Sequence, residues 1–324
     1  MRVLTGAEIL NQHIDGSVVT IGNFDGVHLG HVELFKQLRE KGQQLGLPTV
    51  VITFEPHPLS VLAPGSAPAL ITTSEQKVAL IAETGIDYLV VIEFNLEFSR
   101  ITAEAFVRDI LCRDLGMRHI IIGHDYAFGC ERQGNYETLE RLGSQCGFTV
   151  QDIDPVGEGG AIFSSSLARR LIDSGDLGKA NAILGRYHVI SGQVVHGRQI
   201  GAKLGFPTAN ITTRNELIPS DGVYAVMVAI DGTLLKGACS IGTNPTFGDS
   251  DRTIEVFLLD FSGRLYDHEI AICFVQRLRE IKKFFDVEEL IETIGRDISV
   301  TRQILDSVDR QKLQPLLLLG KIRS

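Results

Sequence analysis

Between residues 17 and 153 the chain alternates short apolar runs with longer amphipathic stretches, a pattern that strongly restricts the folds open to it. The apolar runs are SVVTI, TVVITF, DYLVVIEF, HIIIG and FTVQDI. Strands that alternate with helices predict a parallel sheet with helices on both faces. The runs VVIEF and HIIIGH are apolar at nearly every position, as expected for strands buried on both sides. In the helix expected over 29–44, the core-facing stripe is formed by Leu29, Val32, Phe35 and Leu38.

The pattern changes near Leu184, where extended, β-rich runs replace the alternation and continue over 187–275. Within them Asp231 and Gly232 separate VYAVMVAI from TLLKGACSI. An Asp-Gly pair between two such runs is a strong signal for a type I′ hairpin. The second half is therefore predicted to form an antiparallel sheet or a small barrel.

Helical periodicity returns near the end of the chain, over 286–305. There one face of the expected helix carries Leu290, Ile294 and Ile298. The chain has 324 residues, which agrees with roughly two domains of about 150 residues each. We expect an α/β domain over 1–184 and a β domain with a terminal helix over 185–324.

The composition excludes several classes of protein. Lys plus Arg number 31 against 40 Asp plus Glu, and the net charge of −9 lacks the basic excess that draws a chain to nucleic acid or an anionic membrane. The five cysteines are odd in number and form no C-x-x-C pair, so neither a disulfide framework nor a zinc ribbon is indicated. The sequence has no apolar run near the roughly 18 residues of a membrane span and no secretory h-region at its start. These features predict a cytoplasmic protein without a nucleic-acid or membrane partner.

The motif TIGNFDGVHLGH, at residues 20–31, follows an expected strand and opens an expected helix. Ligands of open α/β sheets bind beyond the carboxyl ends of strands, where this loop lies. His28 and His31 are three residues apart at the helix start, so both imidazoles can face one phosphate, and the helix N–H groups add positive potential. The spacing is not G-x-G-x-x-G, which disfavours a dinucleotide-binding oxidoreductase. The alternative is that both histidines only cap the helix.

A second candidate phosphate site is SSSLAR, at residues 164–169. It places Ser164 and Ser165 at a helix start with Arg169 one turn in, and these side chains are suitable donors to phosphate oxygens. Taken alone, serines at such a position are more often plain N-caps.

The segment GHDYAFG, at residues 123–129, follows the strand HIII and combines a carboxylate with two aromatic rings. Tyr126 and Phe128 can border a planar ligand by stacking, or they can fill the core instead. His57, in a proline-rich loop, is either a ligand contact or a solvated loop residue.

The motifs GNFDGVHLGH, GHDYAFG and SSSLAR, in this order, resemble the amino-terminal adenylyltransferase module of the bacterial bifunctional riboflavin kinase/FMN adenylyltransferases, or FAD synthetases. The second half resembles their kinase module through GQVVHGRQIGAKLGFPTANI, GVYAV, IGTNPTFG and EVFLLDFSGRLYD. The resemblance implies a Rossmann-like nucleotidyltransferase parallel sheet followed by an antiparallel β-barrel riboflavin kinase domain and a terminal helix. It further implies phosphorylation of riboflavin to FMN by ATP with Mg²⁺, then adenylylation of FMN to FAD with release of pyrophosphate.

In the first module the resemblance gives His28 and His31 the role of binding and stabilising the ATP phosphates while the FMN phosphate attacks the α-phosphorus. The positions implied to bind the nucleotide or the flavin are Asn23, Asp25, Asp125, Tyr126, Phe128, Ser164, Ser165 and Arg169. The family's serine motif usually reads S-S-T-x-I-R, and here Ser166 and Ala168 replace the threonine and the isoleucine. Because a hydroxyl is kept, we expect phosphate binding to be kept as well.

In the second module Thr208 and Asn210 are two apart in an extended segment, so their side chains share one face. Their oxygens suit Mg²⁺, which bridges nucleotide phosphates and keeps several waters. Glu255 matches the family's catalytic carboxylate, which accepts the proton of the ribityl hydroxyl. Gly197 and Gly201 fit a flap close to the ATP phosphates. Without the resemblance, Thr208 and Asn210 would be interpreted as part of a polar turn and Glu255 as a solvated strand residue. Gly197 and Gly201 would be interpreted as a loop bend.

The kinase half departs from the family at three places. Ala202-Lys203 stands where an arginine is common, Phe257 replaces a common histidine, and Ile281 replaces a frequent acidic residue. Arg279, which is kept, is expected to contact the flavin.

Riboflavin, FMN and ATP are the implied partners, with FMN and FAD as substrate or product rather than prosthetic groups. Two rival hypotheses are an enzyme with one active module and a sensor that binds flavin without turnover. A monomer and a homo-oligomer are both compatible with the sequence.

Overall fold

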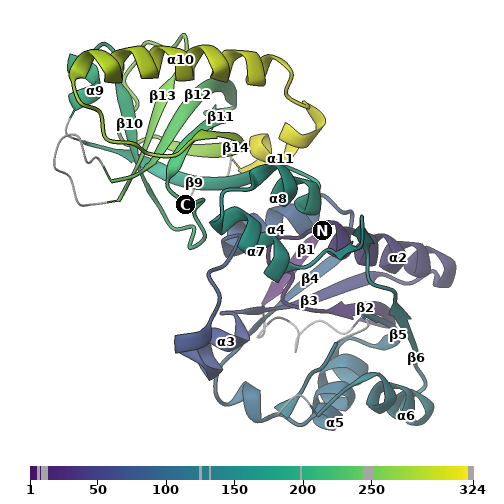
Figure 1. The fold of residues 1–324 in the computed structure, drawn as a ribbon. Helices are drawn as coiled ribbons and strands as arrows, with labels where there is room; N and C mark the ends of the chain where they lie inside the picture. Colours follow the sequence, from purple (N-terminus) through teal and green to yellow (C-terminus); the bar gives the residue numbers. More distant parts are fainter. Residues whose placement is uncertain are drawn as a thin grey trace. The chain divides into compact units, whose positions relative to one another are not determined.

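The computed structural model describes residues 1–5, 8, 14–123, 126–130, 133–197, 199–243 and 252–319. These residues form two compact units, coloured along the chain in Figure 1. The first unit comprises Met1–Ala69 and Lys77–Ser164, and the second comprises Leu70–Gln76 and Ser165–Ser324.

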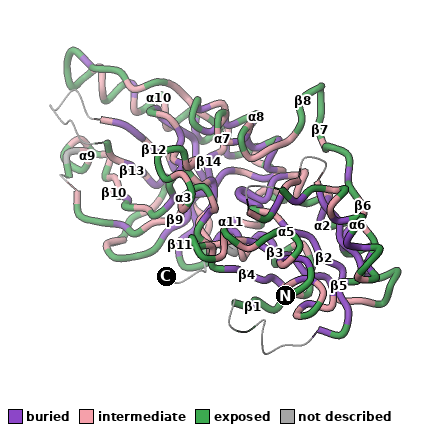
Figure 2. Tube along the Cα trace, turned by 90° about the horizontal axis from the view of Figure 1, so that it is seen from below, coloured by how far each residue is buried: buried purple, intermediate pink, exposed green. Residues whose placement is uncertain are grey.

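A parallel sheet of six strands forms the centre of the first unit, in the order β1-β4-β3-β2-β5-β6. Its strands are β1 (Arg2–Thr5), β2 (Ser17–Ile21), β3 (Thr49–Glu55), β4 (Tyr88–Glu93), β5 (Met117–Gly123) and β6 (Thr149–Ile153). Every residue of β2 is buried, and the central strands are purple in the burial view of Figure 2. The parallel sheet predicted from the apolar runs is confirmed.

Two separate apolar clusters cover the two faces of this sheet. One face packs against α2 (Leu29–Leu45) and α4 (Ser74–Ala82), whose buried leucines and isoleucines meet Val18, Val51 and Ile121. The other face packs against α5 (Ala103–Ala105), the π-helix η3 (Phe106–Asp114) and α6 (Tyr136–Cys146). Shorter elements are α3 (Pro58–Leu62), η1 (Pro64–Ser66), η2 (Phe98–Arg100), β7 (Gly157–Glu158) and β8 (Ala161–Ile162).

The buried side of α2 differs from the stripe expected from its sequence. Its buried residues are Leu34, Phe35, Leu38 and Gly42, whereas the Val32 residue is 38% exposed. The expected stripe was therefore wrong at Val32. A stripe with a strict spacing of three drifts around a helix of 3.6 residues per turn, whereas the observed set follows the helical period.

The second unit is a closed barrel of six antiparallel strands in the order β10-β13-β12-β11-β14-β9. The strands are β9 (His188–Val195), β10 (Thr208–Thr213), β11 (Gly222–Ile230), β12 (Thr233–Gly242), β13 (Thr253–Leu258) and β14 (Glu269–Arg279). Asp231 and Gly232 form the predicted two-residue hairpin turn, with φ of 47° and 81°, as a type I′ turn requires. Closure pairs each of these strands on both sides and encloses one apolar core.

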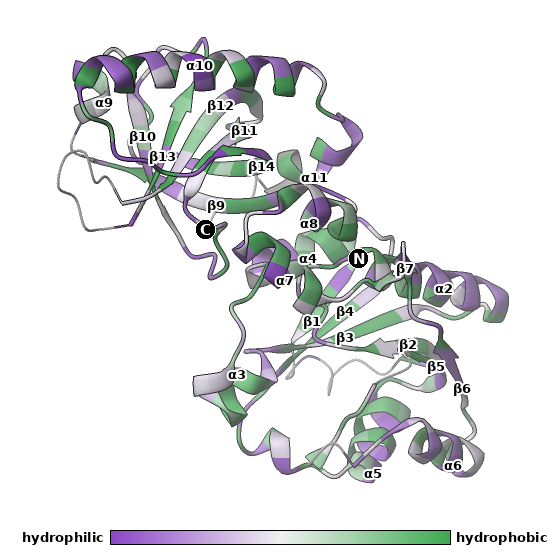
Figure 3. Cartoon of the chain, viewed as in Figure 1, coloured by the Kyte–Doolittle hydropathy of each residue, from purple (hydrophilic) through white to green (hydrophobic). Residues whose placement is uncertain are grey.

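Helices complete the second unit. They are α7 (Ser165–Asp173), α8 (Leu177–Leu184), α9 (Ile200–Lys203), α10 (Val287–Asp306), the 3₁₀-helix η6 (Gln311–Leu313) and α11 (Gln314–Leu319). On α8, Asn181 donates to the carbonyl of Phe274 and accepts from the amide of His188, so this helix packs with the barrel although the sequence boundary placed it before the β domain. In Figure 3 α10 carries both hydrophobic and hydrophilic residues, as its amphipathic pattern predicts. Within the described part of the chain, no helix is long and apolar enough to cross a membrane.

Candidate active sites

The first candidate site lies where the order of the parallel sheet reverses. β2 pairs with β3 on one side and with β5 on the other, so the loops after β2 and β5 open at a topological switch point. Ligands of open α/β sheets bind in the crevice at such a point. The loop after β2 carries Asn23, Asp25 and His28, and the segment after β5 carries Tyr126 and Phe128. Asp125 falls outside the described residues.

His28 and His31 lie together at the start of α2. His28 is the N-cap residue, and its Nδ1 accepts the backbone N–H of Gly30 at 3.2 Å. The two imidazole rings stack with centroids 3.7 Å apart, and His31 also meets the ring of Phe24 edge-on at 5.1 Å. His28 therefore does cap the helix through Nδ1, as the simpler interpretation requires. The amino terminus of α2 places positive potential where an anionic group can bind.

A contact between Asn23 and His57 joins the loop after β2 to the start of α3. Nδ2 of Asn23 lies 3.2 Å from Nε2 of His57, and Thr53 donates to the carbonyl oxygen of Asn23 at 3.1 Å. His57 caps α3 through Nδ1 and is only 8% exposed, and Asp25 is 4% exposed. The interpretation of His57 as a solvated loop residue was therefore wrong. The signal in the sequence was the His-Pro pair, because Pro at the first helical position marks the preceding residue as a cap.

The serine motif begins beside the same loop. A Cβ built on Gly30 would lie 3.0 Å from the His28 ring and 3.6 Å from the carbonyl oxygen of Phe163, so the residue before Ser164 passes close to the start of α2. Ser164 is the last residue of the first unit, and Ser165 is the first residue of α7. Arg169 lies one turn into that helix, as its sequence position predicts.

The aromatic segment after β5 divides between core and surface. Phe128 is 7% exposed, packs in the apolar cluster under the sheet, and pairs its backbone with Gly134. The ring of Tyr126 stacks on it with centroids 5.6 Å apart and is only partly buried. Phe128 thus supports the segment from within the core, and Tyr126 is the more accessible ring.

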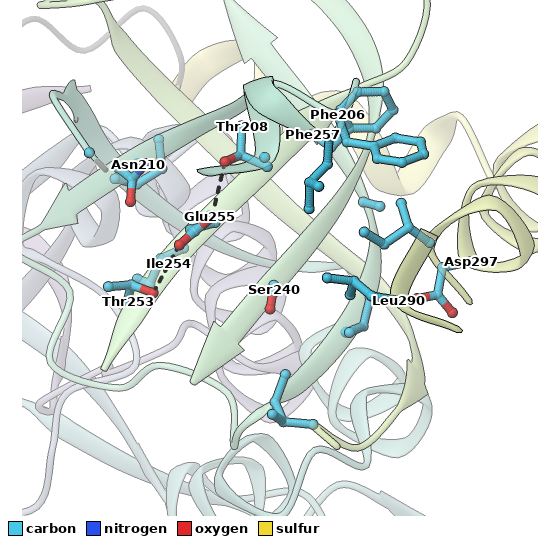
Figure 4. Close-up of a pocket in the computed structure, with 18 of the residues that line it drawn as sticks. Phe206, Thr208, Asn210, Ser240, Thr253, Ile254, Glu255, Phe257, Leu290 and Asp297 are labelled. Atoms are coloured by element: carbon cyan, nitrogen blue, oxygen red, sulfur yellow. Dashed lines mark hydrogen bonds between the residues drawn. The ribbon is translucent and has the colours of Figure 1, made fainter. Parts of the chain in front are cut away.

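The second candidate site is a cavity of about 440 Å³ in the barrel unit, drawn in Figure 4. Three polar residues form a row across its wall, because Glu255 on β13 pairs directly with Asn210 on β10 and with Ser240 on β12. Thr208 lines the same cavity two residues before Asn210. The spacing of Thr208 and Asn210 therefore places both on one face, as the alternation of a strand predicts.

Two hydroxyl groups hold the Glu255 carboxylate. Thr208 Oγ1 donates to Oε2 at 3.0 Å, and Thr253 Oγ1 donates to Oε1 at 3.4 Å, as the dashed lines in Figure 4 mark. An ionised carboxylate only accepts hydrogen bonds, and each donor stabilises its charge. The Glu255 carboxylate is therefore held in a defined orientation at the wall of a cavity.

Gly197 and Gly201 pack directly on this polar row. A Cβ on Gly197 would lie 2.1 Å from Nδ2 of Asn210, and one on Gly201 would lie 2.4 Å from the carbonyl oxygen of Phe206. The Cβ of Gly201 would also lie 3.5 Å from Oγ1 of Thr208. Both glycines allow a backbone approach that any side chain would block.

The opposite wall of the cavity is apolar. Leu290, Ile294 and Ile298 of α10 line it, so the face expected from their spacing is the face that meets the cavity. Phe257, which replaces a common family histidine, meets Phe206 edge-on with centroids 5.8 Å apart. These apolar surfaces suit a flat, aromatic ligand next to the polar row.

Arg279 at the end of β14 also lines the cavity, but its guanidinium group forms an ion pair with a carboxylate of the protein. Nε and Nη2 donate to Asp297 of α10 at 2.8 to 3.1 Å, and Nη1 donates to the carbonyl oxygen of Glu280. This bidentate pair joins α10 to β14. The sequence identified Arg279 but not Asp297, because two residues on separate elements meet only after the helix folds back.

The described residues contain no group of three or more His, Cys, Asp or Glu side chains that could hold a metal ion. Thr208 and Asn210 instead present a hydroxyl and an amide oxygen on one strand face. Such hard oxygen donors fit Mg²⁺, which needs few protein ligands when nucleotide phosphates supply the others.

Comparisons with known proteins give a family for each half of the chain. A family model described as FAD synthetase matches residues 10–167, and one described as riboflavin kinase matches residues 184–305. The bifunctional riboflavin kinase/FMN adenylyltransferase of Pseudomonas fluorescens is 38% identical over 305 residues, covering 94% of this chain and 98% of that protein. Its counterpart in Escherichia coli K12 is 37% identical over 305 residues, covering 94% and 97%. A crystal structure of a macrolide-efflux protein from Streptococcus pneumoniae has a TM-score of 0.84 at 29% identity, covering 93% and 99% of the two chains.

Proposed function

The chain belongs to the family of bifunctional riboflavin kinase/FMN adenylyltransferases, and we propose that it converts riboflavin to FMN in the barrel unit and FMN to FAD in the sheet unit. The observation that carries the proposal is the row of Asn210 and Glu255, with Thr208 beside it, on one wall of the 440 Å³ cavity. This row supplies a base and oxygen ligands next to an apolar surface. A protein that only binds flavin has no need of an oriented base.

In the kinase step Glu255 accepts the proton of the ribityl primary hydroxyl while that oxygen attacks the γ-phosphorus of ATP and ADP leaves. Thr208 and Asn210 are the residues that would hold Mg²⁺, which when bound neutralises the charge of the phosphates. The apolar face of α10 and the Phe206–Phe257 pair would hold the flavin ring. Arg279 acts in this scheme through Asp297, by fixing α10 as a wall of the cavity.

In the adenylyl step an oxygen of the FMN phosphate attacks the α-phosphorus of ATP, and pyrophosphate leaves without a covalent enzyme intermediate. His28 and His31 stabilise the negative charge that develops on the attacked phosphate. Asn23 and Asp25 line the nucleotide side of this site. Ser164, Ser165 and Arg169 keep the triphosphate-binding role that the family resemblance implies, and Tyr126, Phe128 and Asp125 keep the flavin-side role.

The proposal assigns adenylyl transfer to 1–184 and riboflavin phosphorylation to 185–324, and it places the protein in the cytoplasm. All five cysteines are free thiols, which supports a reducing compartment. The proposed partners are the small molecules riboflavin, FMN and ATP. The net charge of −9 supports the expectation that neither nucleic acid nor an anionic membrane is a partner.

The experiment that tests this function is incubation of the purified chain with riboflavin, ATP and Mg²⁺, followed by chromatographic separation of riboflavin, FMN and FAD over time. We expect FMN to rise first and then to decline as FAD accumulates. FMN without FAD would limit catalysis to the barrel unit and leave His28 and His31 as structural residues. Tight riboflavin binding without either product would support the sensor hypothesis instead.

A further inference from the structure

Thr253 lies between the Glu255 carboxylate and a backbone carbonyl. It is the first residue of β13 and points to the same face as Glu255, because the two residues are two apart in one strand. Its Oγ1 is 3.4 Å from Oε1 of Glu255 and 3.3 Å from the carbonyl oxygen of Gly242, the residue opposite it on β12. A hydroxyl has one hydrogen, so Thr253 can donate to only one of these two acceptors at a time.

The two threonines act on different oxygens of the carboxylate. Thr208 donates to Oε2 and Thr253 donates to Oε1. The terminal torsion of a glutamate side chain is broad, so a donor on one oxygen leaves the plane of the carboxylate free to rotate. Donors on both oxygens fix that plane and thus the direction from which Glu255 can take a proton.

We propose that Thr253 is a positioning residue of the kinase reaction, which holds the plane of the Glu255 carboxylate through Oε1. The inference rests on the proposed kinase function. In the reaction the ribityl O–H bond breaks, its proton moves to a Glu255 oxygen, the alkoxide oxygen bonds to the γ-phosphorus of ATP, and the bond to the ADP oxygen breaks. Thr253 thereby fixes the direction from which the Glu255 carboxylate takes this proton.

The other charged groups around the cavity are already engaged. Among the described lining residues, Arg279 pairs with Asp297, Arg252 pairs with Asp221, and Lys282 pairs with Glu289. His196 also lines the cavity, and its ring stacks on Tyr266. Behind Glu255, burial and then the charge of Glu255 raise the pKa of the Cys239 thiol, so this group stays neutral. In the described part of the chain, the hydroxyl groups of Thr208 and Thr253 form hydrogen bonds to the Glu255 carboxylate oxygens.

The test compares Thr253→Val, which keeps the shape and removes the hydroxyl, with Thr253→Ser, which keeps the hydroxyl. Both are made in the full chain, and kcat and KM for FMN formation are measured at one fixed pH. Loss of one hydrogen bond to a charged group predicts a fall of about 10- to 100-fold in kcat for Thr253→Val. We expect its KM for riboflavin to stay within about twofold, since Thr253 does not act on flavin binding, and Thr253→Ser to keep kcat within about threefold.

The split between kcat and KM, together with the rescue by Thr253→Ser, distinguishes positioning from packing. In a Glu255→Gln background, Thr253→Val should change the residual rate little, because the anion is already gone. Adenylylation of supplied FMN and riboflavin binding serve as folding controls.

Two results would overturn the inference while leaving the kinase function intact. One is a Thr253→Val enzyme with the kcat of the parent. The other is a Thr253→Ser enzyme as impaired as Thr253→Val, which would make the methyl group the important feature. A parent chain that forms no FMN from riboflavin and ATP would instead reject the proposed function and this inference together.

Discussion

The backbone of Gly197 lies against the side-chain amide of Asn210, so closely that a Cβ at position 197 would stand 2.1 Å from Nδ2 and 2.4 Å from Cγ. Cβ atoms in proteins essentially never lie within 3.0 Å of a heavy atom from another part of the chain. Any other residue at position 197 must therefore displace the Asn210 amide or the backbone. The position of Asn210, a proposed magnesium ligand, thus depends on the absence of a Cβ at position 197.

Gly197→Ala should therefore lower riboflavin kinase activity by more than about tenfold, since misplacement of a reacting or metal-binding group by about 1 Å is that costly. FMN supplied from outside should still be converted to FAD. Gly295→Ala is the matched control, because a Cβ there meets nothing within 4 Å and the position lies inside α10. Equal kinase activity in the two variants would show that the Asn210 amide does not need its observed position.

His28→Asn separates the capping role of His28 from its proposed catalytic role. Asn is a good N-cap residue, so it preserves the start of α2, whereas His28→Ala also removes the cap at a cost of about 1 kcal/mol. Both variants should lose FAD formation by about a hundred- to a thousandfold, because both lose the imidazole that stabilises the attacked phosphate. FMN formation from riboflavin is the internal control. Full FAD synthesis by His28→Asn would reduce His28 to a helix cap.

Asn210→Ala and Glu255→Gln should produce the opposite separation. Each removes a group of the barrel cavity, so conversion of riboflavin to FMN should fall at least about a hundredfold. Conversion of supplied FMN to FAD should stay near the parental rate, because none of the residues proposed for that site lines the barrel cavity. A parallel loss of both activities, measured by the same chromatographic assay, would indicate unfolding instead.

His119 on β5 should make the stability of the sheet unit depend on pH. Its side chain is 3% exposed, Nδ1 lies 2.6 Å from Oγ1 of Thr149, and burial, followed by the charge of Lys41, lowers the pKa of its imidazole below the ordinary 6.5. Above pH 6.5 the ring is neutral in both the folded and the unfolded chain. As the pH falls below 6.5 the unfolded chain takes up the proton first, so the free energy of unfolding decreases until the pH passes the lowered value.

Urea unfolding of the full chain at pH 7.5 and pH 5.5 would measure this effect, with His119→Gln as the comparison. Gln cannot take up the proton and can still bond to Thr149, so the variant should lose less stability over the same pH range. An identical loss in both proteins would assign the pH dependence to other groups.

The sequence was sufficient for features that depend on local pattern. The apolar runs predicted the parallel sheet, Asp231-Gly232 predicted the hairpin, and the spacing of Thr208 and Asn210 predicted their common face. Each of these follows from the period of a strand or the backbone demands of a turn.

Contacts between distant segments could not be read in the same way. His57 was ambiguous because its burial depends on Asn23, 34 residues earlier. The partner of Arg279 lies on α10, 18 residues later. Thr253 was not identified at all, since its interaction with the Gly242 carbonyl needs the register of β12 against β13. These side chains become a site only after tertiary pairing brings their elements together.

The closed barrel has a consequence for the time during which the chain is made. β9 pairs with β10 and with β14, and β14 begins 74 residues after β9 ends. At ribosomal speeds of about 5–20 residues per second, β9 waits about 4 to 15 seconds for its last partner. During this interval one edge of β9 exposes unpaired N–H and C=O groups, which can template pairing with another nascent chain. In the finished barrel none of the six strands has a free edge. During synthesis, however, each new copy avoids aggregation only if no neighbouring chain pairs with the open edge of β9 for several seconds.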